Sequence, residues 1–430
     1  MLKFNTKNVC SRNLSDALII RKYRASVKRI SDDISIGKLP GTEMMGWQDL
    51  IRNYETSELL SMRKKAEQWI SSKIKYVLVI GIGGSYVGVR AAIDMCLTPF
   101  NQTGPEVIWV HNMSSTYLCS LMEKVQNEKF AIIVISKSGT TLEPALAFRL
   151  LRKTLEKKMG VAASRKNIVA ITDYEKGTLH DLAKKNHYVT FGIRNDIGGR
   201  FSTLTPVGMF IMMVKGIDTL MVLKGAKQAL NDTSSSTLDN NSAFLYACYR
   251  HYLHTVKQMN IESFIVYEPS LTFVGEMWKQ IFGESEGKQH KGLYPTLCLF
   301  TTDLHSMGQY LQEGTRNFFE TTLMVKEPML DKIVSVKDDD DSLKYLNNRS
   351  IDFINKKAFE GTIAAHTKLG KVDNFVIEIT KADAYHFGYL FTWFAMTVTM
   401  SGYLLKINPF NQPGVDAYKK NMFKLLGKKI

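Results

Sequence analysis

The stretch FAIIVISKSGTTLEPALAFRLL, residues 130–151, contains a strand, a turn and a helix within one short piece of chain. Residues 130–135 are uncharged and rich in β-branched side chains, which predicts a strand buried on both faces. After Pro144, a residue tolerated only in the first turn of a helix, the apolar spacing is that of an amphipathic helix. The turn SKSGTTLE, residues 136–143, therefore joins a buried strand to a helix N-terminus, where backbone amides lack partners within the helix.

The pattern of a short apolar strand followed by a helix repeats outward from this stretch. In the first half of the chain it occurs at residues 76–80, 107–110, 130–135 and 168–172. In the second half it occurs at residues 264–267, 296–300 and 375–379. Strands that alternate with helices predict doubly wound, mainly parallel sheets, so we expect an α/β protein with two αβα halves.

Length and composition favour two domains. A chain of 430 residues, 45% of them hydrophobic, can bury two ordinary cores or one large one. The polar stretch NDTSSSTLDNNS, residues 231–242, interrupts the pattern and is the best candidate for a linker. We therefore predict an N-terminal helical segment at 1–70, a first domain at 71–230, a second domain at 243–420 and a C-terminal tail at 421–430.

The cysteines and the N-terminus both indicate a cytoplasmic protein. Five cysteines are scattered along the chain without a CxxC pair, which predicts reduced, packed thiols and argues against a structural zinc site. The N-terminal residues MLKFNTKNVCSRNL contain no apolar core of signal-peptide length, so we do not expect export. The cysteines are Cys10, Cys96, Cys119, Cys248 and Cys298.

One stretch raises the question of a membrane span. Residues 387–405 contain no charged side chain and are long enough to cross a bilayer. The stretch nevertheless includes several threonines, a serine and a glycine, and it stands alone in the chain. We therefore predict a helix buried in a large core, and no membrane partner.

The chain is strongly basic, with 56 Lys and Arg against 41 Asp and Glu and a formal net charge of +15. Such a balance is typical of proteins that bind nucleic acid or an acidic substrate. The basic residues occur in pairs all along the chain, as at Lys356-Lys357 and Lys428-Lys429, without an aromatic-interleaved patch. We therefore predict a small anionic substrate and no nucleic-acid partner.

The loop GIGGSYVG, residues 81–88, follows the strand at 76–80 and invites comparison with nucleotide-binding loops. The dinucleotide spacing fails, because Tyr86 occupies the last glycine position and the next strand ends at His111 where an acidic residue is needed. The ATP-type loop fails as well, because Val89 stands where lysine is required. A glycine loop that opens a helix remains, and it allows the backbone to approach a small polar ligand closely.

The turn SKSGTTLE is a candidate phosphate site. Its hydroxyls, its glycine and the amides of the helix N-terminus together suit the three oxygens of a phosphate monoester. A capped turn without a ligand is the alternative that the residues alone leave open.

Two further segments carry charged candidates. NDIGGRFSTLTPVG, residues 195–208, presents Arg200 after a sharp glycine bend, although a structural arginine would fit equally well. In the helix predicted to begin near Val274, Gln280 and Glu284 are spaced i and i+4 and share one face, although a lone glutamate at a helix end is usually solvated.

Taken together, these segments resemble the phosphoglucose isomerase family, in particular its shorter bacterial members. NDIGGRFSTLTPVG and GYLLKINPFNQPGVDAYK look like the two family signatures, and GIGGSYVG, SKSGTTLE and GESEGK occur in the expected order. The resemblance covers about residues 70–420. The second signature departs mildly, with Asn411 where Asp is common and Asp416 where Glu is common, and neither position is one to which we assign proton transfer.

The family resemblance implies a fold and a reaction. It implies two sugar-isomerase domains, each an αβα sandwich, and usually a homodimer. It also implies reversible conversion of glucose 6-phosphate to fructose 6-phosphate by ring opening and a cis-enediol proton transfer. Such a proton shuttle requires no metal and no organic cofactor, and no cluster of His, Asp and Glu in the sequence has ligand spacing.

The resemblance also assigns roles to individual residues. Glu284 matches the base that moves the proton, and Arg200 matches the cation that stabilises the enediolate. His305 and Lys419 match the pair that opens the sugar ring. The SKSGTTLE loop would hold the phosphate, with Lys137 acting through its amide. The implied substrate contacts are Gly84, Ser85, Ser136, Lys137, Ser138, Thr141, Gln280 and Gln412.

The histidine assignment depends on the branch of the family. Animal-type members carry the ring-opening histidine in an HQGT context, whereas residues 312–315 of this chain are QEGT. Shorter bacterial members have a histidine like His305, and this chain resembles those. His251, His254 and His386 lie in helical stretches, where a core or surface position is the expected one.

Two alternatives remain open from the sequence. Another sugar isomerase, such as a mannose-6-phosphate isomerase or a dual-specificity enzyme, would share these loops. A non-catalytic sugar-phosphate sensor would keep SKSGTT but would not need Glu284 and Lys419. Such sensors usually carry a DNA-binding segment, and residues 1–70 contain no convincing helix-turn-helix.

Overall fold

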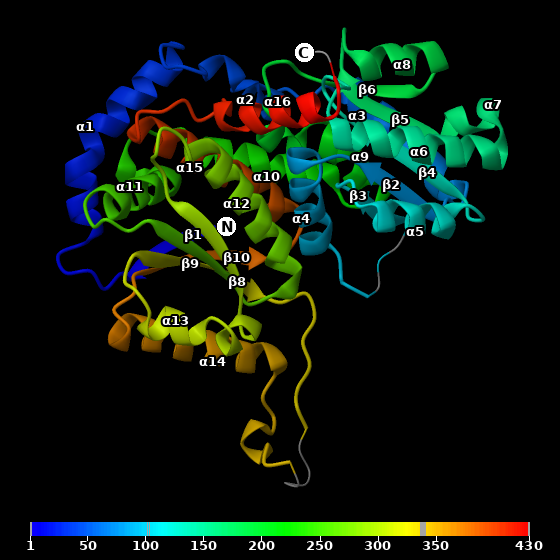
Figure 1. The fold of residues 1–430 in the computed structure, drawn as a ribbon. Helices are drawn as coiled ribbons and strands as arrows, with labels where there is room; N and C mark the ends of the chain where they lie inside the picture. Colours follow the sequence, from blue (N-terminus) through cyan, green and yellow to red (C-terminus); the bar gives the residue numbers. More distant parts are fainter. Residues whose placement is uncertain (1, 101, 103, 336–340, 429–430) are drawn as a thin grey trace. The chain divides into compact units, whose positions relative to one another are not determined.

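The computed structural model describes residues 2–100, 102, 104–335 and 341–428 (Figure 1). The chain divides into two compact units. The first unit comprises Glu43–Lys227 and Asp383–Gly388. The second unit comprises Met1–Thr42, Gln228–Ala382 and Tyr389–Ile430. Each unit contains one five-stranded sheet among the described residues.

The sheet of the first unit is parallel throughout, with the strand order β3-β2-β4-β5-β6. Its strands are β2 (Tyr76–Ile80), β3 (Glu106–Val110), β4 (Phe130–Ile135), β5 (Ile168–Asp173) and β6 (Val189–Ile193). Every residue of β2 and β4 is buried, as expected for strands that helices cover on both faces. All four apolar runs predicted in this half are strands, and β6 is an additional one.

Helices cover both faces of this sheet. They are α2 (Gly46–Arg52), α3 (Thr56–Ser71), α4 (Val87–Cys96), α5 (Ser115–Val125), α6 (Leu142–Met159), α7 (Val161–Ser164), α8 (Thr178–Asn186), α9 (Pro206–Val214) and the first part of α10 (Thr219–Asp232). On one face, α5, α6 and α8 pack against a cluster that includes Leu78, Ile132 and Ala170. On the other, Trp69 of α3 packs edge-on against Phe210 of α9, with ring centroids 5.4 Å apart.

The sheet of the second unit has the strand order β1-β10-β9-β7-β8. Its strands are β1 (Lys3–Asn8), β7 (Ile261–Val266), β8 (Tyr294–Leu299), β9 (Phe318–Glu327) and β10 (Asn374–Lys381). Four strands are parallel, and β1 pairs antiparallel with β10 at one edge. The predicted fold class, α/β with mainly parallel, doubly wound sheets, is confirmed.

Helices cover both faces of the second sheet as well (Figure 1). The helices of the second unit are α1 (Asp16–Ser35), α11 (Ser242–Thr255), α12 (Thr272–Glu286), α13 (Gly308–Glu313), α14 (Ile351–Ala364), most of α15 (Ala384–Leu404) and α16 (Asp416–Leu425). Phe264 of β7 packs against Trp278 of α12 and Phe394 of α15, with ring centroids 4.8 and 6.0 Å apart. Leu311 of α13 and Phe359 of α14 belong to a separate apolar cluster.

The N-terminal segment corrects one prediction. Residues 1–70 were predicted to be helical, but Lys3–Asn8 forms the edge strand β1. The reason is tertiary, because Phe4 packs against Tyr246 and Phe375 with ring centroids 5.2 and 5.6 Å apart. The first unit also begins at Glu43, which differs from the predicted limit at residue 70, and its main segment ends at Lys227, close to the predicted linker.

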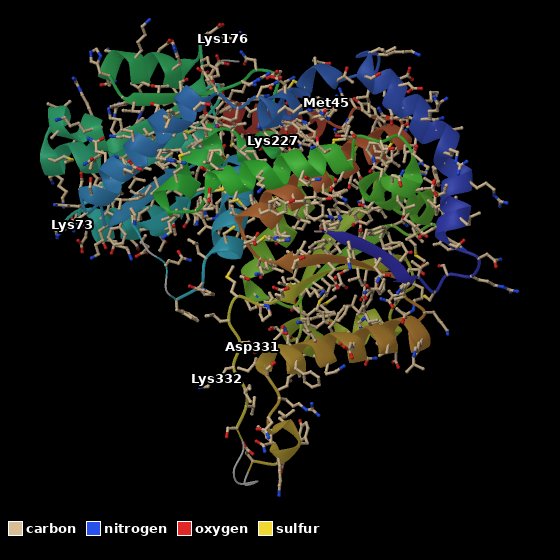
Figure 2. All side chains as sticks on the ribbon, turned by 180° about the vertical axis from the view of Figure 1, so that it is seen from behind. Met45, Lys73, Lys176, Lys227, Asp331 and Lys332 are labelled. Atoms are coloured by element: carbon tan, nitrogen blue, oxygen red, sulfur yellow. The ribbon has the colours of Figure 1, made fainter. Side chains whose placement is uncertain are left out.

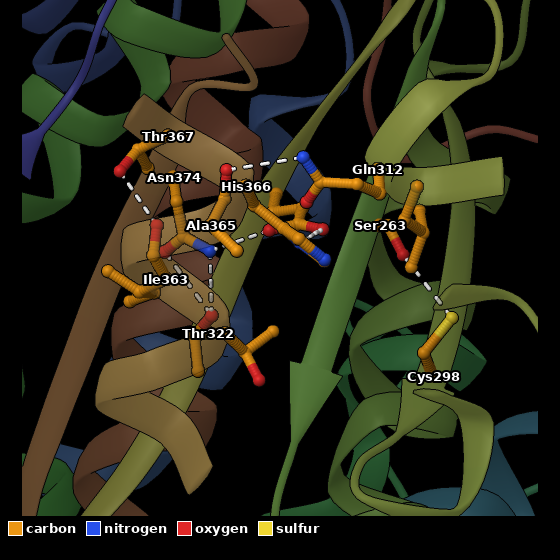
Figure 3. A network of polar contacts seen from close by, with 12 residues as sticks. Ser263, Cys298, Gln312, Thr322, Ile363, Ala365, His366, Thr367 and Asn374 are labelled. Atoms are coloured by element: carbon orange, nitrogen blue, oxygen red, sulfur yellow. Dashed lines mark hydrogen bonds and ion pairs between the residues drawn. The ribbon is translucent and has the colours of Figure 1, made fainter. Parts of the chain in front are cut away.

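A buried polar network explains why β9 has a charged residue in its interior (Figure 3). Glu320 is 1% exposed, and its two carboxylate oxygens contact His366 Nδ1 at 2.9 Å and Asn374 Nδ2 at 2.8 Å. Asn374 Nδ2 also donates to Thr322 Oγ1 at 3.1 Å. Because buried polar groups must be paired, β9, β10 and the π-helical turn at Ala365–Leu369 depend on one another.

Helix α15 contains all but the last residue of the uncharged stretch at residues 387–405. Phe391, Trp393 and Phe394 are fully buried, and the hydroxyl of Thr397 donates to the carbonyl of Trp393 at 2.8 Å. The prediction of a buried helix is therefore confirmed. Among the helices of the described residues, none is long and apolar enough to cross a membrane.

Figure 2 shows two of the basic side chains, Lys73 and Lys176, well apart on the first unit. The cysteine side chains follow their prediction with one exception. All five cysteines are free thiols. Cys248 and Cys298 are buried, whereas Cys119 is exposed on α5 and is not the packed thiol that was predicted.

Candidate active site

The SKSGTT loop (residues 136–141) joins β4 to α6, and a glycine determines its shape. Gly139 has a φ of +74°, and a Cβ at this position would lie 2.2 Å from the backbone nitrogen of Leu179. Glycine satisfies both conditions because it lacks a Cβ. The amide of Thr178 donates to the carbonyl of Ser138 at 3.1 Å. The N-terminus of α8 therefore supports the loop directly.

The hydroxyls of the loop gather at the N-terminus of α6. Ser136 Oγ accepts the amide of Gly139 at 3.0 Å, and Ser138 Oγ lies 2.8 Å from Thr140 Oγ1. Thr141 occupies the N-cap in an extended conformation, but its side chain makes no capping hydrogen bond. First-turn amides and the helix dipole favour a negative charge at this position. The loop therefore has the donors that an anion requires.

Lys137 directs its side chain away from the hydroxyls. Its Nζ donates to the carbonyl of Asn195 at 3.1 Å, and its own carbonyl accepts the hydroxyl of Thr172 at 3.2 Å. Partial burial lowers the pKa of this ammonium, against the opposing influence of Asp173 and Asp196. The lysine links the SKSGTT loop to the segment that carries Arg200.

The glycine loop and the arginine segment are in direct contact within the first unit. A Cβ on Gly84 would lie 1.9 Å from the carbonyl oxygen of Gly199 and 2.9 Å from the amide of Arg200. Gly84 and Ser85 belong to the short helix Gly83–Ser85, and Arg200 to the short helix Gly199–Leu204. Arg200 is only 5% exposed. The structure therefore brings the loops that carry Gly84 and Arg200 together.

An ion-pair cluster that the sequence reasoning missed supports this arginine segment. Arg194 Nε and Nη2 donate to the two oxygens of Asp196 at 2.9 and 2.6 Å, and Nη1 donates to Asp49 at 2.8 Å. The hydrogen bonds from Arg194 hold the pKa of Asp196 below its usual range. Asp49 is far away in sequence, so no local spacing could reveal this contact.

Helix α12 carries the carboxylate candidate. It spans Thr272–Glu286 and so begins close to the predicted Val274. Gln280 Nε2 donates to Glu284 Oε2 at 3.1 Å, as the i and i+4 spacing predicts. Gln280 and Glu284 are both half-buried, so the pair is partly shielded from solvent.

The histidine candidate lies in a short helix after β8. His305 ends the helix Thr302–His305 and is exposed. Asp303 supports this turn, because its carboxylate accepts the amide of Leu299 at 2.7 Å and the hydroxyl of Ser306 at 3.1 Å. Sequence reasoning missed Asp303, although an aspartate after a strand is a common turn residue.

The remaining candidates lie near the C-terminus. Gln412 is exposed and precedes the short helix Pro413–Val415. Lys419 is half-buried in the first half of α16. The predicted site residues thus fall into two sets. The first unit carries Gly84, Ser85, Ser136, Lys137, Ser138, Thr141 and Arg200, and the second carries Gln280, Glu284, His305, Gln412 and Lys419.

Across residues 2–100, 102, 104–335 and 341–428, no group of three or more His, Cys, Asp or Glu side chains is placed to hold a metal ion.

Comparison with known families identifies the chain. A family model described as phosphoglucose isomerase matches residues 48–322. The chain belongs to the phosphoglucose isomerase family. The match includes Arg200, Glu284 and His305, whereas Gln412 and Lys419 lie beyond it.

Curated members of the phosphoglucose isomerase family extend the similarity over nearly the whole chain. A glucose-6-phosphate isomerase from Mycoplasma mobile is 45% identical over 421 residues, which is 97% of this chain and 97% of that protein. A glucose-6-phosphate isomerase from Alkaliphilus metalliredigens is 49% identical over 397 residues, covering 90% of this chain and 88% of that protein.

Solved structures support the phosphoglucose isomerase fold. A protein from Thermus thermophilus superposes with a TM-score of 0.89 at 24% identity, covering 99% of this chain and 100% of that one. A glucose-6-phosphate isomerase from Chlamydia trachomatis superposes with a TM-score of 0.79 at 20% identity, covering 99% of this chain and 88% of that one. A protein from Silicibacter pomeroyi also superposes, with a TM-score of 0.53 at 13% identity, covering 86% of this chain and 98% of that one.

Proposed function

We propose that this chain interconverts glucose 6-phosphate and fructose 6-phosphate through ring opening and a cis-enediol intermediate. The observation that carries the proposal is the 45% identity to a glucose-6-phosphate isomerase over 97% of both chains. The proposed reaction calls for no metal or organic cofactor, because one carboxylate can move the proton between carbons 2 and 1.

The SKSGTT loop is proposed to bind the phosphate of the substrate. The hydroxyls of Ser136, Ser138 and Thr141 and the amide of Lys137 would donate to the phosphate oxygens. The N-terminus of α6 supports this role, and so does the side chain of Thr141, which makes no capping hydrogen bond. Gly84 and Ser85 would line the sugar, and the close packing of Gly84 against the backbone of Gly199 supports this role because it places their loop beside Arg200.

Glu284 is proposed as the base that takes the proton from carbon 2 and returns it at carbon 1. Its contact with Gln280 supports this role, because a hydrogen bond restricts the carboxylate to a defined orientation. Arg200 would stabilise the negative charge of the enediolate. Its burial supports this assignment, because a shielded cation interacts more strongly with a developing charge.

Ring opening requires one group that protonates the ring oxygen and another that removes the proton of the anomeric hydroxyl. His305 and Lys419 are proposed for this pair, and Gln280 and Gln412 for contacts to the sugar. We further propose that the protein is a cytoplasmic homodimer with a small sugar phosphate as its substrate.

The test is a comparison of two isosteric substitutions on α12. Glu284→Gln removes the proposed base but keeps an acceptor for Gln280. Glu276→Gln on the same helix removes a carboxylate that pairs with Lys279 at 2.7 Å. Conversion of fructose 6-phosphate to glucose 6-phosphate is measured with EDTA present. We expect Glu284→Gln to lower kcat by about 10²- to 10⁴-fold and Glu276→Gln to retain activity.

The same assay separates the alternative functions. Release of mannose 6-phosphate from fructose 6-phosphate at a comparable rate would indicate a dual-specificity isomerase. Saturable binding of fructose 6-phosphate without turnover by the wild type would contradict the proposed activity and support a sensor. Equal activity of Glu284→Gln and wild type would contradict the role of Glu284.

A further inference from the structure

Three charged side chains form a cluster in the core of the second unit. Arg250 of α11, Glu262 of β7 and Glu286 at the end of α12 are 1%, 0% and 1% exposed. Arg250 Nε donates to Glu262 at 2.6 Å, and its two terminal nitrogens donate to the two oxygens of Glu286. Burial disfavours the cation, but the charges of Glu262 and Glu286 more than offset that burial, so the pKa of Arg250 is raised.

Neutral groups complete the hydrogen bonding of this cluster. Glu262 also accepts the hydroxyls of Tyr246 and Thr321, the latter at 2.6 Å. Arg250 Nη1 also donates to the hydroxyl of Ser401 at 3.1 Å. A buried network in which the members are paired holds its groups in fixed positions, because any movement would leave a charge without a partner.

The cluster holds α12 at two points that flank Glu284. The guanidinium carbon of Arg250 lies 4.1 Å from the ring centroid of Phe282, two residues before Glu284, and the bidentate contact reaches Glu286, two residues after it. Residues two apart lie on different faces of a helix, so Glu284 points away while its neighbours are held. Gly292 reinforces this end, because a Cβ there would lie 2.7 Å from the carbonyl oxygen of Glu286.

We propose that Arg250 and Glu286 are positioning residues for proton transfer, acting through the last turn of α12 on the carboxylate of Glu284. The inference rests on the proposed function, in which Glu284 is the base. Glu262 fixes the other side of the same arginine to β7 and does not belong to α12. It therefore provides a matched control within one cluster.

The experiment compares Glu286→Gln with Glu262→Gln. Each substitution is isosteric and removes one buried carboxylate charge from Arg250, and the melting temperature of each variant is measured so that the loss of kcat can be compared with the loss of stability. We expect Glu286→Gln to lower kcat by about tenfold to a hundredfold with little change in KM, because a small displacement of a reacting group costs rates of this order. We expect Glu262→Gln to change kcat by less than about threefold. If both variants lost kcat in proportion to their loss of stability, the proposal would be overturned.

A second readout tests whether Glu286 acts through Glu284. If it does, Glu286→Gln should not reduce further the residual activity of Glu284→Gln, because the group that it positions is already absent. A full additional loss in the double variant would contradict the proposal. Failure of the proposed function would look different from failure of the positioning role. The wild type would then be inactive, or Glu284→Gln would be fully active.

Phe282→Leu provides an independent variant if Glu286→Gln does not fold. It removes the aromatic face under Arg250 and keeps all three charges. The control is Phe319→Leu in β9, an equally buried phenylalanine of the same unit. We expect a lower kcat for Phe282→Leu than for Phe319→Leu at matched stability, and equal kcat values would overturn the proposal.

Discussion

The SKSGTT loop of the first unit and the last turn of α12 in the second unit are positioned by different physical means. The loop depends on the absence of a side chain, because Gly139 lies against the backbone of Leu179. The turn depends on charges, because Arg250 and Glu286 pair in a buried core. The first arrangement requires only that position 139 be glycine, whereas the second requires two oppositely charged residues to be buried as a pair. Substitutions that target each arrangement separately should therefore have different consequences.

The largest effect is expected from a substitution that removes the cation of the buried charge cluster. Arg250→Met leaves two buried carboxylates without their cation and should lower the free energy of unfolding by about 3–5 kcal/mol. Arg24→Met is the control, because Arg24 and its partner Asp239 are 71% and 54% exposed, and its loss should cost about 0–1 kcal/mol. Denaturant unfolding of both variants at pH 7 measures the difference, and equal costs would contradict the structural role of the cluster.

The next effect is expected from a substitution of Gly139 in the SKSGTT loop. Gly139→Ala and Gly160→Ala both place a side chain at positive φ, +74° and +79°, which costs about 1–3 kcal/mol. A Cβ at Gly160 meets nothing within 4 Å, whereas a Cβ at Gly139 meets the backbone of Leu179. We therefore expect only Gly139→Ala to raise the KM for fructose 6-phosphate, by about tenfold, which corresponds to about 1.4 kcal/mol of binding. Steady-state kinetics would detect it, and identical KM values would indicate that the loop tolerates the displacement.

A third effect concerns α11, the helix that carries Arg250. His251 on this helix contacts the hydroxyl of Tyr23 at 2.7 Å, and burial lowers its pKa from 6.5 to about 4. The unfolded chain therefore binds more protons than the folded chain between these values, so stability falls as the pH falls from about 6.5 to about 4. His251→Gln keeps a hydrogen-bonding group but does not titrate.

We expect wild type to lose about 2 kcal/mol more stability than His251→Gln between pH 7 and pH 4, a value reduced for the partial exposure of the ring. Urea unfolding at several pH values measures the difference. Parallel profiles for wild type and His251→Gln would show that this ring does not set the pH dependence.

The smallest expected effect sharpens the comparison of buried and surface charge. The net charge of +15 should attract a dianionic sugar phosphate over long distances. We expect kcat/KM to fall severalfold between about 0.01 and 0.3 M salt, because the screening length shortens. Denaturant stability of the buried cluster should change much less. A flat kcat/KM would exclude electrostatic steering.

The sequence predicted the parts of the fold that local patterns encode. The boundaries of β2 and β4 match the predicted runs because both strands are apolar throughout and end at glycine or serine turns. It missed β9, whose Glu320 breaks the apolar pattern and is tolerated only because His366 and Asn374 pair with it. A strand that depends on distant partners cannot be recognised from its own residues.

The candidate site divides in the same way. Motif residues such as Gly84 and Arg200 were predicted because contiguous signatures carry them, and the contact of their loops follows from the two glycines. The supporting residues Arg194, Asp303 and Arg250 were not predicted. Two of them reach across long stretches of chain, from Arg194 to Asp49 and from Arg250 to Glu286, so their pairing becomes visible only in three dimensions.

The edge strand β1 has a consequence for protein synthesis. It pairs with β10, so Phe4 lies beside Ile377 although almost the entire chain is translated between them. The second unit therefore cannot complete its sheet until synthesis is nearly finished, whereas almost all of the first unit, Glu43–Lys227, has left the ribosome long before. During that interval the edge of the nascent sheet and the apolar faces of α11 and α12 lack their final partners. Nascent chains of this protein should therefore bind chaperones mainly through the second unit.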